Sequence, residues 1–296
     1  MTATLLALLL GLGAASAAEP VYKQIKTVHV INSCHLDIGF ADSSAGIINQ
    51  YFDHHLPMAA AVGKQMQAGV AGYSDRKLGF MFQSWVVALY FDCPPGMGVH
   101  CPSAAAQATA REAIAAGHIT WHAFPHNAEL EVMGADMIEA GLEMTFALDK
   151  KFAQPKKATL SQRDVPGMTR ALVPILKKQG VTAISIGAND GSTPPDVPPC
   201  FLWKDKLSGE TLVGLFNWPG YGSLPLSHQM TCLVDGLEHA LVYNWNGDNA
   251  GPSAAKDYAA HWATVQKAFP NANVYASTLD NFTQVQHTTA IPAVNS

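Results

Sequence analysis

The chain contains few charged residues and no concentration of basic ones. Only 14% of its 296 residues are charged, and 18 Lys and Arg against 23 Asp and Glu give a formal net charge of −5. Without a basic face, the composition argues against a nucleic-acid partner. No glycine-rich phosphate loop follows a strand pattern, so nucleotide binding is not supported. The 48% hydrophobic fraction is typical of a globular chain that forms one large α/β domain or two smaller ones.

Long apolar runs are also scarce. The run near the N-terminus is too short for a comfortable membrane span, and it ends in Ala15-Ser16-Ala17, a small-residue cleavage pattern. We expect residues 1–18 to be a secretory signal peptide and 19–296 to be the mature domain, secreted or in the lumen of the secretory pathway, with no membrane segment. No Lys or Arg precedes the run, so an ordinary apolar N-terminal segment is the alternative.

Cysteine is limited to five residues, which fits an oxidising compartment in part. Cys93 and Cys101 bracket a short Pro/Gly loop that could close as a disulfide, and Cys200 and Cys232 could form a second. Cys34 would then stay unpaired; the alternative is that all five thiols are free. A glycosylation acceptor occurs at Asn281-Phe282-Thr283, so a glycoprotein is expected.

Strand-like and helix-like patterns alternate along the chain. Strands are expected at residues 28–32, 78–82, 119–124, 158–161, 182–186, 211–216, 240–245 and 273–276. Helices are expected at residues 46–66, 104–116, 133–152, 169–179 and 254–268. This alternation predicts an α/β fold with a mainly parallel sheet, which right-handed crossovers can close into a β/α barrel.

Polar turns follow two of the expected strands. His35 and Asp37 come after strand 28–32, and Asp164 comes after strand 158–161. The carboxyl ends of strands collect ligands and catalytic groups in α/β folds, so these three side chains could face one another and bind a divalent metal. The structural alternative is a satisfied histidine with two helix-capping aspartates.

Further polar groups follow other strands. Asp248 comes after strand 240–245, and a second carboxylate opposite Asp164 is what glycosidic cleavage needs, although Asn-Gly-Asp is also a strong turn sequence. Asn127 and Glu129 follow strand 119–124 and offer groups to a hydroxylated ligand, or Glu129 simply favours a helix start. Six aromatic residues near these turns could stack on sugars or lie in the core: Phe40, Trp85, Trp121, Trp203, Trp218 and Trp245.

Taken in order, these motifs resemble the catalytic domain of family 38 glycoside hydrolases, the α-mannosidases. The family's His-x-Asp-Pro-Gly-Trp turn corresponds to residues 35–40, and its Asp-Pro-Phe-Gly nucleophile turn to residues 164–167. Residues 117–129, 201–204 and 276–282 match other segments in order and type. The resemblance covers roughly residues 25 to 285.

The resemblance implies a seven-stranded β/α barrel with a zinc ion and a retaining hydrolase of α-mannosidase type acting on carbohydrate. His35, Asp37 and Asp164 would bind the metal, and Asp164 would also attack the anomeric carbon. Asp248 would be the proton donor. Phe40, in place of the family's tryptophan, would lie beneath the sugar ring, and Asn127 and Glu129 would contact substrate.

Two departures from the family keep alternatives open. Its Gly-Asp-Asp-Phe acid segment reads Gly247-Asp248-Asn249-Ala250 here, and Asn249 cannot donate a carboxyl proton. The family's fourth metal ligand, a distant histidine, has no counterpart; His126 or His228 would have to complete the site. A fragment of a longer protein, a carbohydrate-binding pseudoenzyme and a metal-dependent carbohydrate deacetylase are the alternatives. Calcium could replace zinc, because both ions accept carboxylates.

Overall fold

The computed structural model describes residues 21–70, 72–73, 76–165, 167–189, 191–217, 220, 231–233, 236–286 and 292–295. The signal peptide expected at residues 1–18 lies outside this part of the chain. Among the described helices, none has the length and apolar character needed to cross a membrane.

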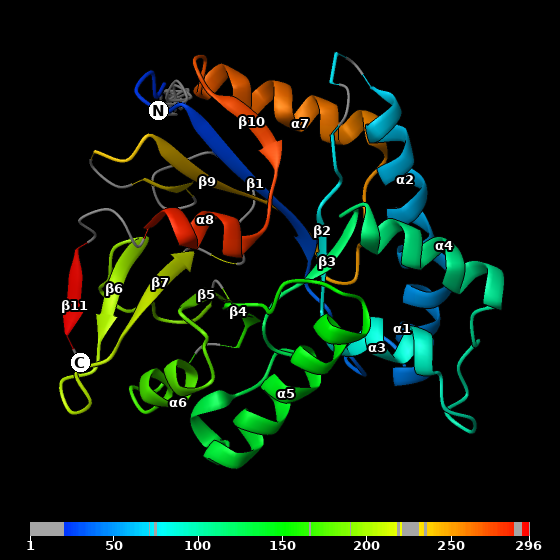
Figure 1. The fold of residues 1–296 in the computed structure, drawn as a ribbon, viewed down its shortest axis with the longest axis horizontal. Helices are drawn as coiled ribbons and strands as arrows, with labels where there is room; N and C mark the ends of the chain where they lie inside the picture. The colour runs from blue at the N-terminus through cyan, green and yellow to red at the C-terminus, as the bar shows by residue number, and fades with distance from the viewer. Residues whose placement is uncertain are drawn as a thin grey trace, which may run out of the picture.

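The strands expected from the sequence are all present, and three short ones are additional (Figure 1). In chain order they are β1 Thr27–Cys34, β2 Phe80–Phe82, β3 Ile119–Trp121, β4 Thr159–Asp164, β5 Ala183–Ala188, β6 Cys200–Lys204, β7 Thr211–Asn217, β8 Thr231–Cys232, β9 His239–Asn246, β10 Asn273–Ala276 and β11 Ala293–Asn295. The additional strands are β6, β8 and β11.

The helices are α1 Ser44–Gln50, α2 Leu56–Ala68, α3 Ser84–Asp92, α4 Ala104–Ala115, α5 Ala135–Lys151, α6 Leu172–Lys178, α7 Ala255–Ala268 and α8 Leu279–Gln286. A π-helical turn, η1 Tyr51–His55, joins α1 to α2, and a 3₁₀ turn, η2 Leu130–Val132, precedes α5. The single helix expected at residues 46–66 is therefore two α-helices with a wider turn between them.

Two sheets contain the described strands. One has the order β3-β2-β1-β9-β8, with β10 also paired to β1, and the other has the order β11-β6-β7-β5-β4. All pairs are parallel except β6 with β7 and β8 with β9. One backbone hydrogen bond, from Ala123 N to Thr159 O at 2.9 Å, connects the chain after β3 to the start of β4.

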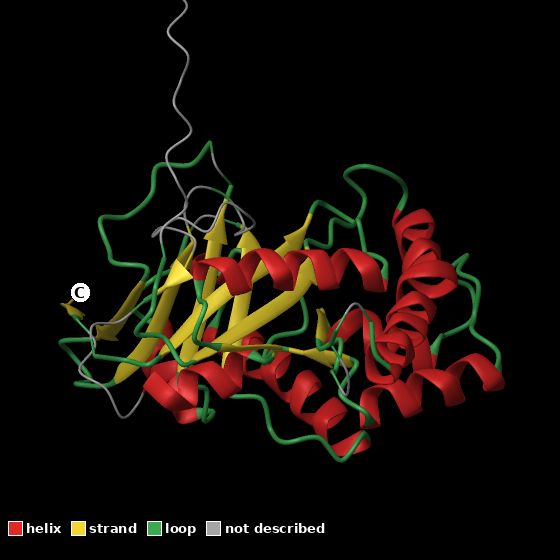
Figure 2. Ribbon diagram, turned by 90° about the horizontal axis from the view of Figure 1, so that it is seen from above, coloured by secondary structure: helices red, strands yellow, loops and turns green. Residues whose placement is uncertain are grey.

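The expected α/β fold with parallel sheets is confirmed, but closure into a seven-stranded barrel is not. No ladder between described strands closes the two sheets on each other. Instead they share a core, because Ile31 and Leu241 of one sheet pack in the same cluster as Ala183 and Val213 of the other. Helices flank the strands in Figures 1 and 2.

Helix α8 closes one end of the space between the sheets. It contacts β4 and β5 of one sheet and β9 of the other, and it buries Leu279 and Phe282 in the shared core. Asp280 Oδ1 of α8 accepts from Ala158 N at 3.2 Å, and Thr283 Oγ1 lies 2.9 Å from Thr159 Oγ1, so α8 lies at the end where β4 begins. The opposite end, where the strands terminate, carries the polar turns.

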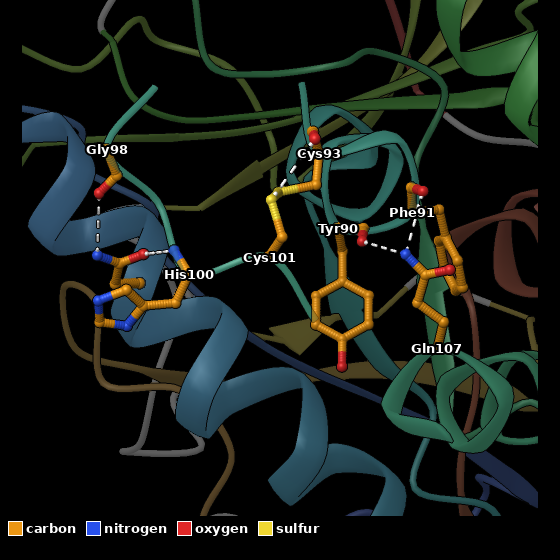
Figure 3. The surroundings of a disulfide bond; sticks show 8 residues. Tyr90, Phe91, Cys93, Gly98, His100, Cys101 and Gln107 are labelled. Atoms are coloured by element: carbon orange, nitrogen blue, oxygen red, sulfur yellow. Dashed lines mark hydrogen bonds between the residues drawn. A yellow bond between two sulfur atoms is a disulfide. The ribbon is translucent and has the colours of Figure 1, made fainter. Parts of the chain in front are cut away.

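Both disulfides expected from the sequence are present. Cys93–Cys101, with Cα atoms 5.7 Å apart, closes the loop after α3 (Figure 3). Beside it, Gln107 Nε2 of α4 donates to the carbonyl oxygens of Tyr90 and Phe91 at 3.2 and 3.1 Å, which satisfies two of the terminal carbonyls of α3.

The second disulfide, Cys200–Cys232, joins β6 of one sheet to β8 of the other, with Cα atoms 5.6 Å apart. Cys34 is a free, buried thiol. Burial raises the pKa of Cys34 to about 11, despite a contact of 3.3 Å between its Sγ and Tyr51 Oη. This thiol is therefore protonated near neutral pH and is a poor nucleophile.

Candidate functional site

A cavity of about 380 Å³ lies at the ends of β1, β3 and β4. Its lining residues are His35, Leu36, Asp37, Ile38, Gln83, Trp85, His126, Asn127, Asp164 and Val165. His35, Asp37, Asn127 and Asp164, all named from the sequence, line this one cavity. The reason is that parallel strands end at the same edge.

Strand alternation aims His35 into the site. In β1, Val28 and Val30 pack in the outer core with the helices, whereas Ile31 packs in the core between the sheets. His35 continues the inward row of odd-numbered residues and is only 3% exposed. Its Nε2 lies 2.9 Å from Asp37 Oδ1, so the two polar residues of this turn form a pair.

The His35–Asp37 turn is held by Asn249. The side-chain oxygen of Asn249 accepts from Asp37 N at 3.1 Å, and its nitrogen donates to Asp37 O at 3.1 Å. Its own N–H donates to His35 O at 2.8 Å. Asn249, at the position that resembles the family's acid, therefore has a structural role. Its left-handed backbone, with φ of 49°, is one that asparagine tolerates well.

Backbone conformation redirects Asp164 toward His35. Alternation along β4 would place Asp164 on the same side as Leu160, which packs in the outer core. Asp164 instead has φ of 72°, in the left-handed region that non-glycine residues rarely adopt. Its Oδ2 lies 3.9 Å from His35 Nε2, and its Oδ1 accepts from Asn189 Nδ2 at 3.1 Å.

Asp248 joins His35 and Asp37 rather than lying apart from them. One potential ligand atom from each of these three residues lies within 4.8 Å of the other two. The sequence predicted Asp164 as the third member of this group, whereas the structure brings Asp248 into it and leaves Asp164 beside it. Partial burial, together with the Asp37 and Asp164 carboxylates, raises the pKa of Asp248, while His35 opposes the shift.

Asn127 contacts other residues of the site with both atoms of its amide. Its oxygen accepts from Arg163 N at 3.0 Å and from Gln83 Nε2 at 3.3 Å. Its nitrogen lies 3.0 Å from His35 Nδ1. Asn127, which the sequence suggested as a substrate contact, therefore also contacts His35, a candidate metal ligand. The sequence did not indicate this second contact.

Glu129 is exposed near the site. Desolvation, the neighbouring Glu131 carboxylate and Asp164 raise the pKa of Glu129. The carboxylate of Glu131 lies against Gly167, where a Cβ atom would collide with it. Because Gly167 has no side chain, the Glu131 carboxylate can approach the turn that follows Asp164.

The aromatic residues named from the sequence separate into different environments. Phe40 is 89% exposed and is absent from the cavity lining, so the described conformation places it in solvent rather than beneath a bound ring. Trp85 lines the cavity, Trp121 is buried, and Trp203 lines a second cavity. Trp245 is buried against the Arg163 guanidinium, 4.4 Å from its ring centroid. Trp218 lies outside the described residues.

The two histidines considered as additional ligands have different outcomes. His126 lines the cavity, and its Nδ1 lies 3.0 Å from Asn127 O. It is not in the group that could hold one ion. His228 lies outside the described residues.

Three site residues, Gln83, Arg163 and Asn189, were not predicted. Arg163 is 1% exposed and donates to Ser185 Oγ and Gln162 O at 2.8 Å each. Its position beside Asp164 in the sequence was the only available signal. An arginine in a buried strand is uncommon and often has a specific partner.

The fold is similar to that of solved structures at low sequence identity. No protein-family model and no curated protein sequence matches the chain. The structure of an α-mannosidase from Enterococcus faecalis V583 is 12% identical, with a TM-score of 0.64 over 91% of this chain and 30% of that chain. A glycosyl hydrolase family 38 protein from Enterococcus faecalis is 12% identical, with a TM-score of 0.55 over 92% of this chain and 28% of that one.

A putative polysaccharide deacetylase from Mycobacterium smegmatis is 14% identical, with a TM-score of 0.50 over 95% of this chain and 98% of that chain. The chain thus spans under a third of the two glycosidase-family structures and nearly all of the deacetylase. At these identities the likeness concerns the fold alone. The chain has a fold similar to that of a portion of the α-mannosidase and family 38 structures and to that of the polysaccharide deacetylase.

Proposed function

We propose that this protein is a metal-dependent retaining glycoside hydrolase of α-mannosidase type. The observation that carries the proposal is the convergence of His35, Asp37, Asp164 and Asp248 at the ends of three strands, beside one cavity. The similarity of the fold to two family 38 structures supports this choice. We propose the seven-stranded β/α barrel of that family together with this function.

The donor set fits a divalent cation. One imidazole and two carboxylates, with ligand atoms within 4.8 Å of one another, suit zinc and are tolerated by calcium. His35 and Asp37 would hold the ion, together with a carboxylate from Asp164 or Asp248. A bound cation would orient sugar hydroxyls and polarise them.

The remaining chemistry belongs to two carboxyl groups. Asp164 acts as the nucleophile, and its contact with Asn189 holds the attacking carboxylate at the cavity wall. Asp248 acts as the proton donor, and desolvation together with the Asp37 and Asp164 carboxylates raises its pKa, the direction that a general acid needs. Asn127 and Glu129 contact the sugar hydroxyls, and Phe40 covers the ring once a substrate is present. Retention of configuration follows from a covalent intermediate on Asp164.

We also propose that the protein is secreted or resides in the secretory-pathway lumen, after removal of residues 1–18. Two disulfides support an oxidising compartment. Asn281, the proposed glycosylation acceptor, is exposed on α8, although Thr283 of the same acceptor sequence is buried.

A metal-dependent carbohydrate deacetylase is the second candidate. The deacetylase structure matches this chain over 98% of its own length, which favours a domain of this size. The donor group described here contains a single imidazole, however. The two functions differ in product, since a deacetylase releases acetate and leaves the glycosidic bond intact.

The test combines metal content with turnover. We expect the purified mature protein to contain near-stoichiometric zinc by elemental mass spectrometry and to hydrolyse an aryl α-mannoside. Asp164→Asn should lower kcat by at least about 1000-fold because the nucleophile is lost. Asp53→Asn makes the same change in an exposed carboxylate that pairs with His100, and should keep activity.

Asp248→Asn separates the two possible roles of that residue. Loss of turnover with metal retained identifies the proton donor, whereas loss of metal identifies a ligand. Full activity of Asp164→Asn would refute the glycosidase assignment. Acetate release from an acetylated oligosaccharide, with no α-mannoside cleavage, would establish the deacetylase. Sugar binding without either reaction would identify a carbohydrate-binding pseudoenzyme.

A further inference from the structure

We propose that Asn127 holds His35 in the neutral tautomer that carries its proton on Nε2, and thereby weakens metal binding at that atom. The inference concerns the regulation of metal affinity and rests on the proposed metal site for its functional consequence. The tautomer itself is a property of the metal-free chain.

The orientation of the Asn127 amide is fixed by a main-chain donor. The N–H of Arg163 can only donate, so the atom of Asn127 that lies 3.0 Å from it must be the oxygen. Gln83 Nε2 donates to the same oxygen at 3.3 Å. The amide nitrogen of Asn127 therefore has to be the atom that faces His35.

This orientation sets the role of His35 Nδ1. The amide nitrogen of Asn127 lies 3.0 Å from Nδ1 and can only donate, so Nδ1 must accept and carries no proton. A neutral imidazole has one N–H, which must then be on Nε2. The contact of 2.9 Å from Nε2 to Asp37 Oδ1 agrees, because a carboxylate accepts that proton.

The proton on the His35 ring is on the opposite nitrogen from the one that a metal-binding histidine protonates. Nε2 is the ring atom directed at Asp37 and Asp164, and a cation there needs its lone pair. The proton would have to move to Nδ1, where it would meet the amide N–H of Asn127. Histidine ligands ordinarily donate this second N–H to a carbonyl or carboxylate, and changes in such partners alter metal affinity by about 10- to 100-fold.

Asn127→Asp should reverse the arrangement with little change of shape. One carboxylate oxygen would keep the bonds from Arg163 N and Gln83 Nε2, and the other would accept from Nδ1–H. Asn189→Asp is the matched control, because it adds the same charge beside Asp164 while the described contact of Asn189 is to that residue rather than to His35.

The first measurement is nitrogen NMR of the metal-free, histidine-labelled mature protein, with the His35 signals assigned by their loss in His35→Ala. We expect the proton on Nε2 in the wild type and in Asn189→Asp, and on Nδ1 in Asn127→Asp. A proton on Nδ1 in the wild type would overturn the inference.

The second measurement is the zinc affinity of the same proteins by titration calorimetry. Asn127→Asp should bind zinc at least about 10-fold more tightly than Asn189→Asp, whose own gain measures the effect of charge. Equal gains would overturn the inference. If Asn127→Asp does not fold, Asn127→Ala removes the opposing donor without adding charge and should also bind more tightly than the wild type.

The two proposals fail differently. If no variant binds zinc but the tautomer changes as expected, the metal-dependent function is wrong and the tautomer assignment stands. If the wild type binds zinc and Asn127→Asp changes neither tautomer nor affinity, the metal site stands and the role of Asn127 is wrong.

Discussion

At the scale of single residues, Asn249 connects two strand ends that carry different parts of the site. Its amide forms both hydrogen bonds with the main chain of Asp37, and it is 6% exposed. Buried hydrogen bonds of this kind compete with no nearby water, so losing one leaves polar groups unsatisfied. Asn249 thus sets the position of Asp37 relative to Asp248, its neighbour in sequence.

Asn249→Gly should lower the free energy of unfolding by about 1–3 kcal/mol, because it removes two side-chain hydrogen bonds with Asp37 and a third from Tyr51 Oη, while glycine accepts the left-handed backbone. Urea unfolding of the disulfide-intact protein measures the change. Asn271→Gly removes one exposed hydrogen bond to Lys23 O and should cost about 0.5 kcal/mol or less. A cost at Asn249 no greater than at Asn271 would contradict the structural role.

The contrast between predicted and unpredicted site residues follows from how each is positioned. His35, Asp37 and Asp164 could be grouped from the sequence because each follows an expected strand, whereas the closeness of Asp248 to His35 and Asp37 appeared only in the structure. The role of Asn127 depends on an orientation fixed 36 residues away at Arg163 N, and that of Asn249 on a contact across 212 residues. Such long-range hydrogen bonds leave no local pattern in a single sequence.

At the scale of elements, Gly63 allows α2 to approach β3 closely. A Cβ atom at Gly63 would collide with the ring of His118, which directly precedes β3 and is 2% exposed. That ring also accepts from Leu78 N at 3.3 Å through Nδ1, so it cannot move without losing a contact near β2. Glycine has a low helix propensity, but the close packing of α2 against His118 requires it at position 63.

Gly63→Ala should destabilise the protein by about 1–3 kcal/mol, although alanine favours a helix interior by about 1 kcal/mol over glycine. The reason is that the added methyl group must displace the His118 ring. Gln65→Ala, at an exposed position of the same helix, should change stability by less than about 0.5 kcal/mol. Thermal unfolding in parallel compares them, and a stabilised Gly63→Ala would show that propensity outweighs packing here.

Elements with a clear period were predictable, and those without one were not. Helix α5 has an apolar face at helical spacing and was expected over residues 133–152. Helix α3 is apolar around most of its circumference, with Val86, Val87, Tyr90 and Phe91 buried, so no amphipathic stripe marks it. The π-helical turn η1 could not be predicted from the sequence either, because it shifts the helical register without changing the composition.

At the scale of the whole molecule, alternation of strands and helices predicted parallel sheets but could not decide their closure. Closure depends on which edge strands meet, and the strands at these edges include the short β8 and β11 that the sequence did not reveal. The two sheets are instead held by a shared core, by α8 at one end and by the Cys200–Cys232 bond between β6 and β8. The site at the other end depends on both sheets, because His35 and Asp248 follow strands of one and Asp164 follows a strand of the other.

The two disulfides should therefore contribute unequally to stability. Cys200 and Cys232 are 32 residues apart in sequence, whereas Cys93 and Cys101 are 8 apart. Because a longer loop loses more entropy in the unfolded chain when it is closed, the loop-entropy relation gives about 3.7 kcal/mol for the first bond and about 2.5 kcal/mol for the second. The longer bond also joins the sheets that carry opposite sides of the site.

Replacing both cysteines of each pair by alanine tests this difference. We expect the Cys200/Cys232 double variant to lose about 1 kcal/mol more in unfolding free energy than the Cys93/Cys101 double variant. It should also lower metal affinity, whereas the Cys93/Cys101 variant should not, because its loop lies outside the site. If both double variants lose the same unfolding free energy and the same metal affinity, the shared core alone holds the two sheets together. The Cys200–Cys232 disulfide would then contribute no more than the Cys93–Cys101 disulfide, which closes a loop.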